Sequence, residues 1–242
     1  MSKNASSTTS QPTTMSIEPQ KIALVTGANR GIGQEIANQL QERGIRVFRG
    51  YRTPSSLLAI HEKHGIQLDI ADSNSIQNSV SHILKETDKL DILINNAATL
   101  LDRELPLEEL TVETFKQTLE INTVAAFELT QAYLPLLKPA THSRVINISS
   151  GAGQLQDMMQ WSPAYGISKA ALNALTIQQS LAYSKYGISV NCVRPGWVRT
   201  RMGGDQAPLS VSEGADTATW LALDANPNET GKLWFERKPT HW

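Results

Sequence analysis

The sequence predicts an α/β fold, a single doubly wound parallel sheet of about seven strands with helices on both faces. From Lys21 to the C-terminus, short apolar runs alternate with segments of helical period, and no repeat or long linker interrupts them. The apolar runs are too hydrophobic for burial on one face only, which is typical of parallel strands covered on both sides. A chain of 242 residues, 40% of them hydrophobic, is long enough to bury one large core.

The first half of the chain contains four predicted strands, at residues 21–27, 45–51, 66–70 and 90–97. The helix after the first strand ends near Gly44, and its apolar face consists of Ile32, Ile36, Ala37 and Leu40. Asp72 stands where the N-cap of the next helix is expected. That helix also has apolar residues at helical spacing, namely Ile76, Val80, Ile83 and Leu84.

The second half continues the alternation. A long helix is predicted from near Thr111 through Asn122 to about Tyr133, and another from Tyr165 to about Ser184, with a short one at 215–223. The strands between and after them are predicted at 144–150, 188–196 and 232–237. Ligands bind such sheets at the carboxyl ends of the strands, near the point where strand order reverses, so we expect the functional residues there.

Composition excludes several classes of protein. The formal net charge is −1, from 22 basic and 23 acidic residues, which provides no electrostatic surface for nucleic acid or for an anionic membrane. No run approaches the roughly 18 apolar residues of a membrane span. Cys192 is the only cysteine, so no internal disulfide forms, which fits a reducing compartment. We expect a cytoplasmic protein.

Residues 1–20 are rich in Ser, Thr, Asn and Gln and predict a disordered leader ahead of one domain at 21–242. This segment has no apolar core and only one basic residue, Lys3, which excludes a secretory signal. A plastid-type transit peptide shares the Ser-rich, acid-poor composition but should also carry arginines.

Residues 26–33, Thr-Gly-Ala-Asn-Arg-Gly-Ile-Gly, form a glycine-rich turn between the first strand and the first helix. Glycines let the chain turn tightly and bring backbone N–H groups against a pyrophosphate at the helix N-terminus. Loops also collect glycines for steric reasons alone, but this position in an alternating chain favours a dinucleotide site. The residues expected to contact the cofactor are Gly27, Asn29, Arg30, Gly31 and Ile32.

The spacing of these glycines resembles the fingerprint of the short-chain dehydrogenase/reductase family, TGxxxGIG, at every fixed position. The resemblance implies a Rossmann-type oxidoreductase domain over 21–242. It also implies that Asp69 and Ile70 lie at the adenine and that Asn96 and Ala97 line the cofactor in the segment Asn-Asn-Ala-Ala, where Ala98 replaces the glycine usual in the family. Asp69 could equally be an ordinary cap at a strand end.

The end of the second strand indicates which cofactor binds. An acidic residue there binds the ribose 2′-hydroxyl of NAD, whereas a cation binds the 2′-phosphate of NADP. The chain reads Arg49-Gly50-Tyr51-Arg52 with no acid, and Arg30 lies in the glycine turn. Arginine suits phosphate because its planar fork donates two hydrogen bonds at once. Either arginine could be a solvated surface charge, but together Arg30 and Arg52 favour NADP(H).

Tyr165 and Lys169 are four residues apart on a predicted helix, so their side chains share one face. An ammonium group near a phenol favours the phenolate and lowers the phenol pKa from about 10 towards the working pH. A tyrosine tuned in this way donates a proton to a carbonyl oxygen as hydride reaches the carbon. The pair also occurs by chance on half-exposed helices. It matches the family motif Tyr-x-x-x-Lys, which implies that both residues also contact the cofactor.

Two further residues complete the expected catalytic group. Ser150 ends a strand at the edge of the sheet where ligands bind, and its hydroxyl can donate to a developing oxyanion. We prefer it to Ser149 because family motifs with two serines place the second one in the site. Asn122 matches the family's helix asparagine, which in relatives holds a water that relays protons to the lysine. The alternative for Asn122 is a solvent-facing polar residue.

Residues 194–202, Arg-Pro-Gly-Trp-Val-Arg-Thr-Arg-Met, extend the resemblance beyond the catalytic helix. By resemblance, Pro195 and Gly196 line the nicotinamide, while Val198 and Thr200 hold its carboxamide and the nearby phosphate. The tail from Ser210 to the end resembles the carbonyl-reductase branch of the family. This implies an NADP(H)-dependent enzyme that reduces ketones or aldehydes, or oxidises the corresponding alcohols.

About a dozen residues separate Thr200 from the short helix, where many relatives have a longer lid. Such a short connection leaves the cleft open, which favours varied or bulky ketones over one enclosed metabolite. In the loop before the catalytic tyrosine, Met158, Met159 and Trp161 are candidates for an apolar substrate wall. Residues of these types are more often simply packing.

A second hypothesis is a non-catalytic NADP-binding regulatory or signalling protein on the same scaffold, because a fold does not determine a function. The complete group of four residues argues for the enzyme, and an NADPH-oxidation assay with a panel of ketones discriminates between the two. An isomerase or dehydratase is disfavoured, since relatives with that chemistry usually have another glycine spacing and longer substrate domains.

We also expect a homodimer or homotetramer built on the two long helices. Some carbonyl reductases carry a long helical insertion before the catalytic tyrosine that blocks this interface, and here that stretch is only slightly longer than usual. The helix after Tyr165 carries more apolar residues than one inward face needs, namely Leu172, Leu175, Ile177 and Leu181.

Overall fold

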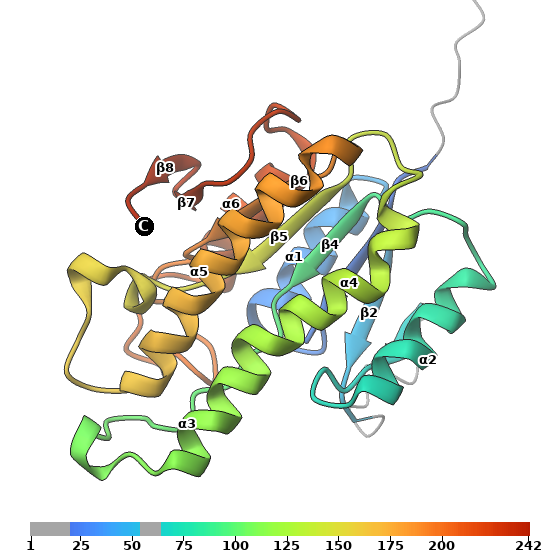
Figure 1. Cartoon of the computed structure of the whole chain (residues 1–242). Coiled ribbons are helices and arrows are strands. Elements are labelled where there is room, and N and C mark those ends of the chain that lie inside the picture. The colour runs from blue at the N-terminus through green and yellow to red at the C-terminus, as the bar shows by residue number, and fades with distance from the viewer. Residues whose placement is uncertain (1–19, 54–63) are drawn as a thin grey trace, which may run out of the picture.

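The computed structural model describes residues 20–53 and 64–242 (Figure 1). The predicted leader, apart from Gln20, lies outside the described residues. The rest forms one α/β domain in which helices flank both sides of a central sheet, as the alternation of apolar runs predicted.

Over the described ranges 20–53 and 64–242, the sheet has eight strands in the order β3-β2-β1-β4-β5-β6-β7-β8. The strands are β1 (Ile22–Thr26), β2 (Arg46–Tyr51), β3 (Gly65–Gln67), β4 (Ile92–Asn95), β5 (Arg144–Ile148), β6 (Ser189–Val193), β7 (Leu233–Phe235) and β8 (Lys238–Thr240). The first seven run parallel, which confirms the predicted sheet. The chain builds outward from β1 through β2 to β3 and then returns to β4, so strand order reverses between β1 and β4.

The eighth strand is an addition to the prediction. β8 pairs antiparallel with β7 at the edge of the sheet. The turn between them places Glu236 and Arg237 in the left-handed region, with φ of 48° and 59°. Hairpin turns with two left-handed residues are normally signalled by Asn or Gly, and neither is present here. Pro239 within β8 also speaks against a strand in the sequence, although an edge strand tolerates it.

Helices cover the two faces in separate groups. One face carries α1 (Gly31–Glu42) and α6 (Val211–Leu223), and the other carries α2 (Ser73–Leu84), α4 (Ala125–Leu137) and α5 (Pro163–Tyr183). Figure 1 shows α4 and α5 side by side in front of the sheet, with α1 and α6 behind it. Each group buries an apolar cluster against the strands, so the core consists of two layers divided by the sheet.

Local capping explains where α2 and α6 begin. The predicted N-cap Asp72 is confirmed, since its side chain accepts a hydrogen bond from Asn74 N at 2.9 Å. α6 begins earlier than expected because Ser210 and Glu213 form a reciprocal capping box. Short 3-10 turns lie at Leu107–Glu109, Gly151–Gly153, Leu155–Asp157 and Ser184–Tyr186.

The long helix predicted from Thr111 to Tyr133 consists of three parts. Thr111 caps α3 (Val112–Leu119), and a π-helical turn follows at Glu120–Val124. α4 then continues directly from this turn. The π turn inserts one extra residue per turn and carries Asn122. Such turns are rare and occur frequently at functional sites.

Within residues 20–53 and 64–242, no helix is long and apolar enough to cross a membrane. In the same residues, no group of three or more His, Cys, Asp or Glu side chains is placed to hold a metal ion. Cys192 is buried in β6, and burial raises the pKa of its thiol to about 12, so the thiol stays protonated at neutral pH.

Candidate active site

The glycine turn packs directly against the end of β4. Gly27 and Gly31 have left-handed backbones, with φ of 64° and 56°. A Cβ on Gly33 would lie 2.3 Å from Asn96 Nδ2 and 2.6 Å from Gly27 O, so only glycine fits there. This close approach places the start of α1 at the point where strand order reverses.

The N-terminus of α1 is open to an anion. Arg30 occupies the N-cap position with an extended backbone, and its side chain makes no capping hydrogen bond. The first amide bonded within the helix ladder is that of Gln34, which donates to Arg30 O at 3.3 Å. The amides of the first turn therefore suit a pyrophosphate, so this part of the chain fits the dinucleotide that the turn predicted.

Thr26 connects the segment after β4 to the glycine turn through hydrogen bonds. Its Oγ1 accepts hydrogen bonds from the backbone N–H groups of Asn96 and Ala97, both at 3.0 Å, and Asn96 Nδ2 donates to Thr26 O at 2.8 Å. Ala98 is not among the residues with a left-handed backbone, so alanine is accommodated where the family usually has glycine.

Arg30 and Arg52 lie on adjacent segments. Ala28 N, in the glycine turn, donates to Gly50 O near the end of β2 at 3.0 Å, which brings the two segments together. Both arginines are exposed. That these two cations bind a phosphate at the adenosine end of a dinucleotide remains a prediction.

Asp69 has the local role that the sequence left open. Its Oδ1 accepts a hydrogen bond from Ala71 N at 3.1 Å, and its backbone N–H donates to Ser75 Oγ at 2.9 Å. Asp69 thus caps the turn before α2, and Ile70 packs against the core beneath it. A contact of either residue with adenine remains a prediction.

Tyr165 and Lys169 lie one turn apart on α5, as predicted. Lys169 Nζ lies 5.7 Å from the centroid of the Tyr165 ring and donates a hydrogen bond to Ile148 O at 2.8 Å. The side chain of Ser150 shares a hydrogen bond with the Tyr165 phenol. The three residues meet where β5 ends and α5 begins.

The expected direction of the Tyr165 pKa is wrong for this structure. Burial raises the pKa of the phenol, and the hydrogen bond with Ser150 lowers it by less. Burial also lowers the pKa of Lys169 from its ordinary 10.5 to about 8. The ammonium is directed at the carbonyl oxygen of Ile148, and the desolvation of the phenol outweighs its influence.

Asn122 is buried rather than solvent-facing. Its Oδ1 accepts from Thr99 N at 2.8 Å, and its Nδ2 donates to Thr99 O and to Ser168 Oγ, both at 2.9 Å. Because Ser168 directly precedes Lys169, Asn122 joins the loop after β4 to the catalytic helix. Its role in a proton relay remains a prediction.

The structure separates the two neighbouring serines. Ser149 is buried, and its hydroxyl donates to Asn173 Oδ1 at 2.6 Å inside the domain. Ser150 instead faces the phenol and caps the turn that follows, where Ala152 N donates to Ser150 Oγ at 3.1 Å. The second serine is therefore the one beside Tyr165.

The segment after β6 lies against the glycine turn. A Cβ on Gly31 would be 3.4 Å from Thr200 Cγ2, so the two loops are in contact distance. Gly196 has a φ of 83°, and a Cβ there would lie 2.5 Å from Leu209 Cδ1. Val198 is buried and packs on α6. Pro195, at the start of this segment, is partly exposed.

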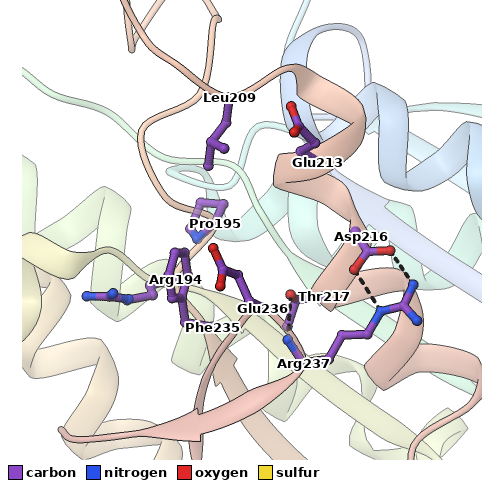
Figure 2. A pocket seen from close by; sticks show the side chains of 9 residues that line it. All are labelled: Arg194, Pro195, Leu209, Glu213, Asp216, Thr217, Phe235, Glu236 and Arg237. Atoms are coloured by element: carbon purple, nitrogen blue, oxygen red, sulfur yellow. Dashed lines mark hydrogen bonds and ion pairs between the residues drawn. The ribbon is translucent and has the colours of Figure 1, made fainter.

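A cavity of about 260 Å³ lies beside Pro195, between the end of β6, α6 and the β7–β8 hairpin (Figure 2). Figure 2 shows Arg237 and Asp216 pointing toward one another, and Arg237 Nε donates to Asp216 Oδ2 at 2.7 Å. The lining is charged and does not include Tyr165. The predicted substrate residues Met158, Met159 and Trp161 are about half exposed, in the loop before α5.

Sequence reasoning missed three residues that support the site. Thr99 and Ser168 hold the amide of Asn122, and Asp102 is fully buried in the loop after β4. A carboxylate three residues after the Asn-Asn-Ala-Ala-Thr segment offered no pattern by itself. Ser162 stands at the N-cap position of α5, but its side chain makes no capping hydrogen bond to the helix.

Comparisons with known proteins agree with this geometry. Residues 21–208 match the model of the short chain dehydrogenase family. The chain is 31% identical to (+)-neomenthol dehydrogenase of Arabidopsis thaliana, over 93% of this chain and 98% of that protein. It is also similar to the crystal structure of NADPH-bound carbonyl reductase from chicken fatty liver (32% identity, TM-score 0.82, 92% and 99% of the two chains). The carbonyl reductase Sniffer of D. melanogaster is similar as well, with 26% identity, a TM-score of 0.84 and the same coverage.

The buried ammonium of Lys169 makes stability depend on pH. Because its pKa is about 8 in the folded protein and 10.5 ordinarily, the unfolded chain binds the proton more tightly, and the cost of burial falls as pH rises above 8. The unfolding free energy of the wild type, minus that of Lys169→Met, should rise by up to about 3 kcal/mol between about pH 8 and about pH 10. Urea denaturation measures it.

A flat or falling difference for Lys169→Met would contradict the lowered pKa.

Proposed function

This chain belongs to the short chain dehydrogenase family, and from that premise we propose that it is an NADP(H)-dependent carbonyl reductase or alcohol dehydrogenase. The observation that carries the proposal is the meeting of Ser150, Tyr165 and Lys169 at the end of β5, on the same edge of the sheet as the glycine turn. Ketones and aldehydes, or the corresponding alcohols, are the substrates that this arrangement serves.

The protein's own groups account for the proton and the oxyanion. Bound NADPH would supply the hydride. Ser150 Oγ donates a hydrogen bond to the carbonyl oxygen, and the Tyr165 phenol donates the proton that this oxygen takes up. The raised pKa of Tyr165 keeps the phenol protonated near neutral pH, which is the form that reduction requires. Lys169, buried next to it, keeps a positive charge close to the developing anion.

The choice of NADP(H) rests on charge. Arg30 and Arg52 offer two guanidinium groups on adjoining segments, and β2 ends in Gly50-Tyr51 without a carboxylate. A similar protein, the chicken carbonyl reductase, has NADPH bound in its crystal structure. The other cofactor contacts proposed here are Gly27, Asn29, Gly31, Ile32, Asp69, Ile70, Asn96, Ala97, Pro195, Gly196, Val198 and Thr200.

Broad substrate range follows from the shape of the mouth of the site. Only residues 201–209 separate Thr200 from the N-cap of α6, so the segment over the cleft is short. Met158, Met159 and Trp161, in the loop before α5, expose about half of their surface, and we assign them to a substrate wall that suits apolar substrates of varied size. The relative of Arabidopsis thaliana is named for a monocyclic terpene alcohol, neomenthol.

The competing function is a non-catalytic NADP-binding regulator. The hydrogen bonds around Asn122 and Lys169 and the placement of Ser150 opposite Tyr165 favour the enzyme, because a regulator has no need of this arrangement. An assay of NADPH oxidation with a panel of aliphatic, cyclic and aromatic ketones separates the two, and no oxidation with any of them would favour the regulator.

Replacing Tyr165 with phenylalanine should remove the proton donor and leave the cofactor site intact. We expect Tyr165→Phe to lower kcat for ketone reduction by about 10²- to 10⁴-fold, the usual contribution of a general acid, with NADPH affinity nearly unchanged. Steady-state kinetics and NADPH fluorescence titration measure the two effects. Lys169→Ala should weaken both.

The exposed Tyr186 is the control, and Tyr186→Phe should keep wild-type kinetics. Turnover of a tenth or more of the wild type in Tyr165→Phe would remove Tyr165 from this role.

Replacing Arg52 with alanine tests the choice of cofactor. Charge-assisted hydrogen bonds contribute roughly 1.5–3 kcal/mol each, and exposure places Arg52 near the lower end, so KM for NADPH should rise about tenfold. The reaction with NADH should hardly change, because NADH lacks the phosphate. Arg43→Ala, at the far end of α1 in an exposed pair with Asp224, is the matched control. Equal losses with both cofactors, or a wild type that prefers NADH, would refute the assignment.

We propose a dimer or tetramer in which a second copy covers α4 and α5. Their outer surfaces expose Phe127, Ile167 and Leu181 at 45%, 36% and 69%, with Val124 at 43% where α4 begins. Figure 1 shows the two helices side by side on one face of the domain. Of the four apolar residues predicted as a surplus on α5, Leu181 is exposed, Leu172 is buried, and Leu175 and Ile177 are partly buried.

Light scattering should therefore give a mass of two or four times 26.6 kDa at micromolar concentration. Leu181→Lys combined with Phe127→Lys should shift the protein towards a monomer, because the interface would bury uncompensated charges. Leu84→Lys, at an equally exposed position on α2, should leave the mass unchanged. A monomeric wild type would overturn the proposal.

A further inference from the structure

Asp102 is a carboxylate with no exposed surface, in the loop that follows β4. Its Oδ2 accepts hydrogen bonds from Ala164 N at 2.6 Å and from Tyr165 N at 3.3 Å. These are amides of the first turn of α5, where helix amides have no partner within the helix. Asp102 therefore caps the catalytic helix from a position 63 residues before Tyr165.

The residue that immediately precedes α5 does not cap the helix with its side chain. Ser162 occupies the N-cap position, and serine is among the preferred caps. Its backbone is left-handed, with a φ of 56°, and its side chain makes no hydrogen bond to the first turn. Its hydroxyl instead accepts from Glu104 N at 3.4 Å. The start of α5 thus depends on the loop after β4.

That loop is itself held on several sides. Thr99 exchanges hydrogen bonds with Asn122, and Ser162 N donates to Leu105 O at 3.2 Å. The guanidinium of Arg103 donates to Met202 O in the segment after β6. Asp102 therefore presents its oxygen to α5 from a fixed backbone.

Burial of the carboxylate is costly, which argues for a role beyond stability. Among the residues that the structure describes, Asp102 Oδ1 has no hydrogen-bond partner. Removing a carboxylate from water costs free energy, and here only one of its two oxygens is hydrogen-bonded. A neutral serine or asparagine at the N-cap position would cap the helix without that cost. What the remote carboxylate provides, and a local cap would not, is a fixed connection between the first turn of α5 and the loop beside the cofactor site.

The position of the first turn matters for Tyr165. A Cβ on Gly166 would lie 3.1 Å from Ala152 O, so the start of α5 already packs closely on the turn that follows Ser150. Lys169 holds the helix one turn further on, through Ile148 O. Without Asp102, the first turn of α5 would lose its two hydrogen bonds from a buried carboxylate, and a shift of the phenol away from Ser150 would follow.

We propose that Asp102 is a positioning residue for Tyr165, whose carboxylate holds the first turn of α5 so that the phenol stays opposite Ser150. This inference rests on the proposed function, since it assigns Asp102 to the proton-donating step of carbonyl reduction. It predicts a loss in kcat and not in cofactor binding.

The test compares Asp102→Ala and Asp102→Asn with the wild type, using a ketone that the wild type reduces. Because misplacement of a catalytic group by about 1 Å costs up to about 10²-fold, Asp102→Ala should lower kcat by about 10- to 100-fold with KM for NADPH within about twofold. Asp102→Asn keeps one acceptor oxygen but forms weaker, uncharged hydrogen bonds. Its kcat should therefore lie between that of the wild type and that of Asp102→Ala, about two- to tenfold below wild type.

Asp72→Ala is the matched control. Asp72 is also an N-cap carboxylate that accepts from a first-turn amide, on α2 and away from Tyr165. Its loss should lower the midpoint of thermal unfolding without lowering kcat, when each variant is assayed at the same interval below its own midpoint.

A kcat for Asp102→Ala that equals that of Asp72→Ala, or a raised KM for NADPH with unchanged kcat, would overturn the inference. If Asp102→Ala does not fold, Asp102→Asn decides, and a kcat equal to that of the wild type overturns the inference. A wild type that reduces no ketone refutes the proposed function first, and the inference falls with it.

Discussion

The hydrogen bond from Lys169 Nζ to Ile148 O joins α5 to the end of β5, and the arrangement of the site depends on it. Ser150 follows Ile148 by two residues, and Tyr165 precedes Lys169 by one helical turn, so this contact helps to set the distance between the serine hydroxyl and the phenol. Lys169 is only 2% exposed. A buried charge without a partner would be costly, and the hydrogen bond to Ile148 O provides that partner.

The same burial decides the electrostatics of the pair. Desolvation raises the pKa of Tyr165 and lowers that of Lys169, so the phenol and the ammonium each shift towards their neutral forms. Near neutral pH the phenol keeps its proton and Lys169 remains largely charged. A protonated phenol beside a positive charge is suited to donate a proton to an oxygen that becomes negative, which agrees with reduction of a carbonyl group.

Features that depend on a few neighbouring residues were predicted correctly from the sequence. Features that depend on contacts between distant residues were not. The glycine turn, the cap at Asp72 and the Tyr165–Lys169 spacing are read within a few residues, and the structure contains each of them. β8 was missed because its left-handed turn has no Asn or Gly, and α6 was placed late because the capping box at Ser210 was not used.

The sequence by itself determined the doubly wound sheet, the glycine turn ahead of α1, and the placement of Tyr165 and Lys169 on one face of a helix. These follow from periodicity and from conformations that only glycine adopts. Only the tertiary structure decided the direction of the Tyr165 pKa, the burial of Asn122 and the capping of α5 by Asp102. Desolvation and hydrogen bonds between distant segments depend on which surfaces meet, and no local pattern in a single chain contains that information.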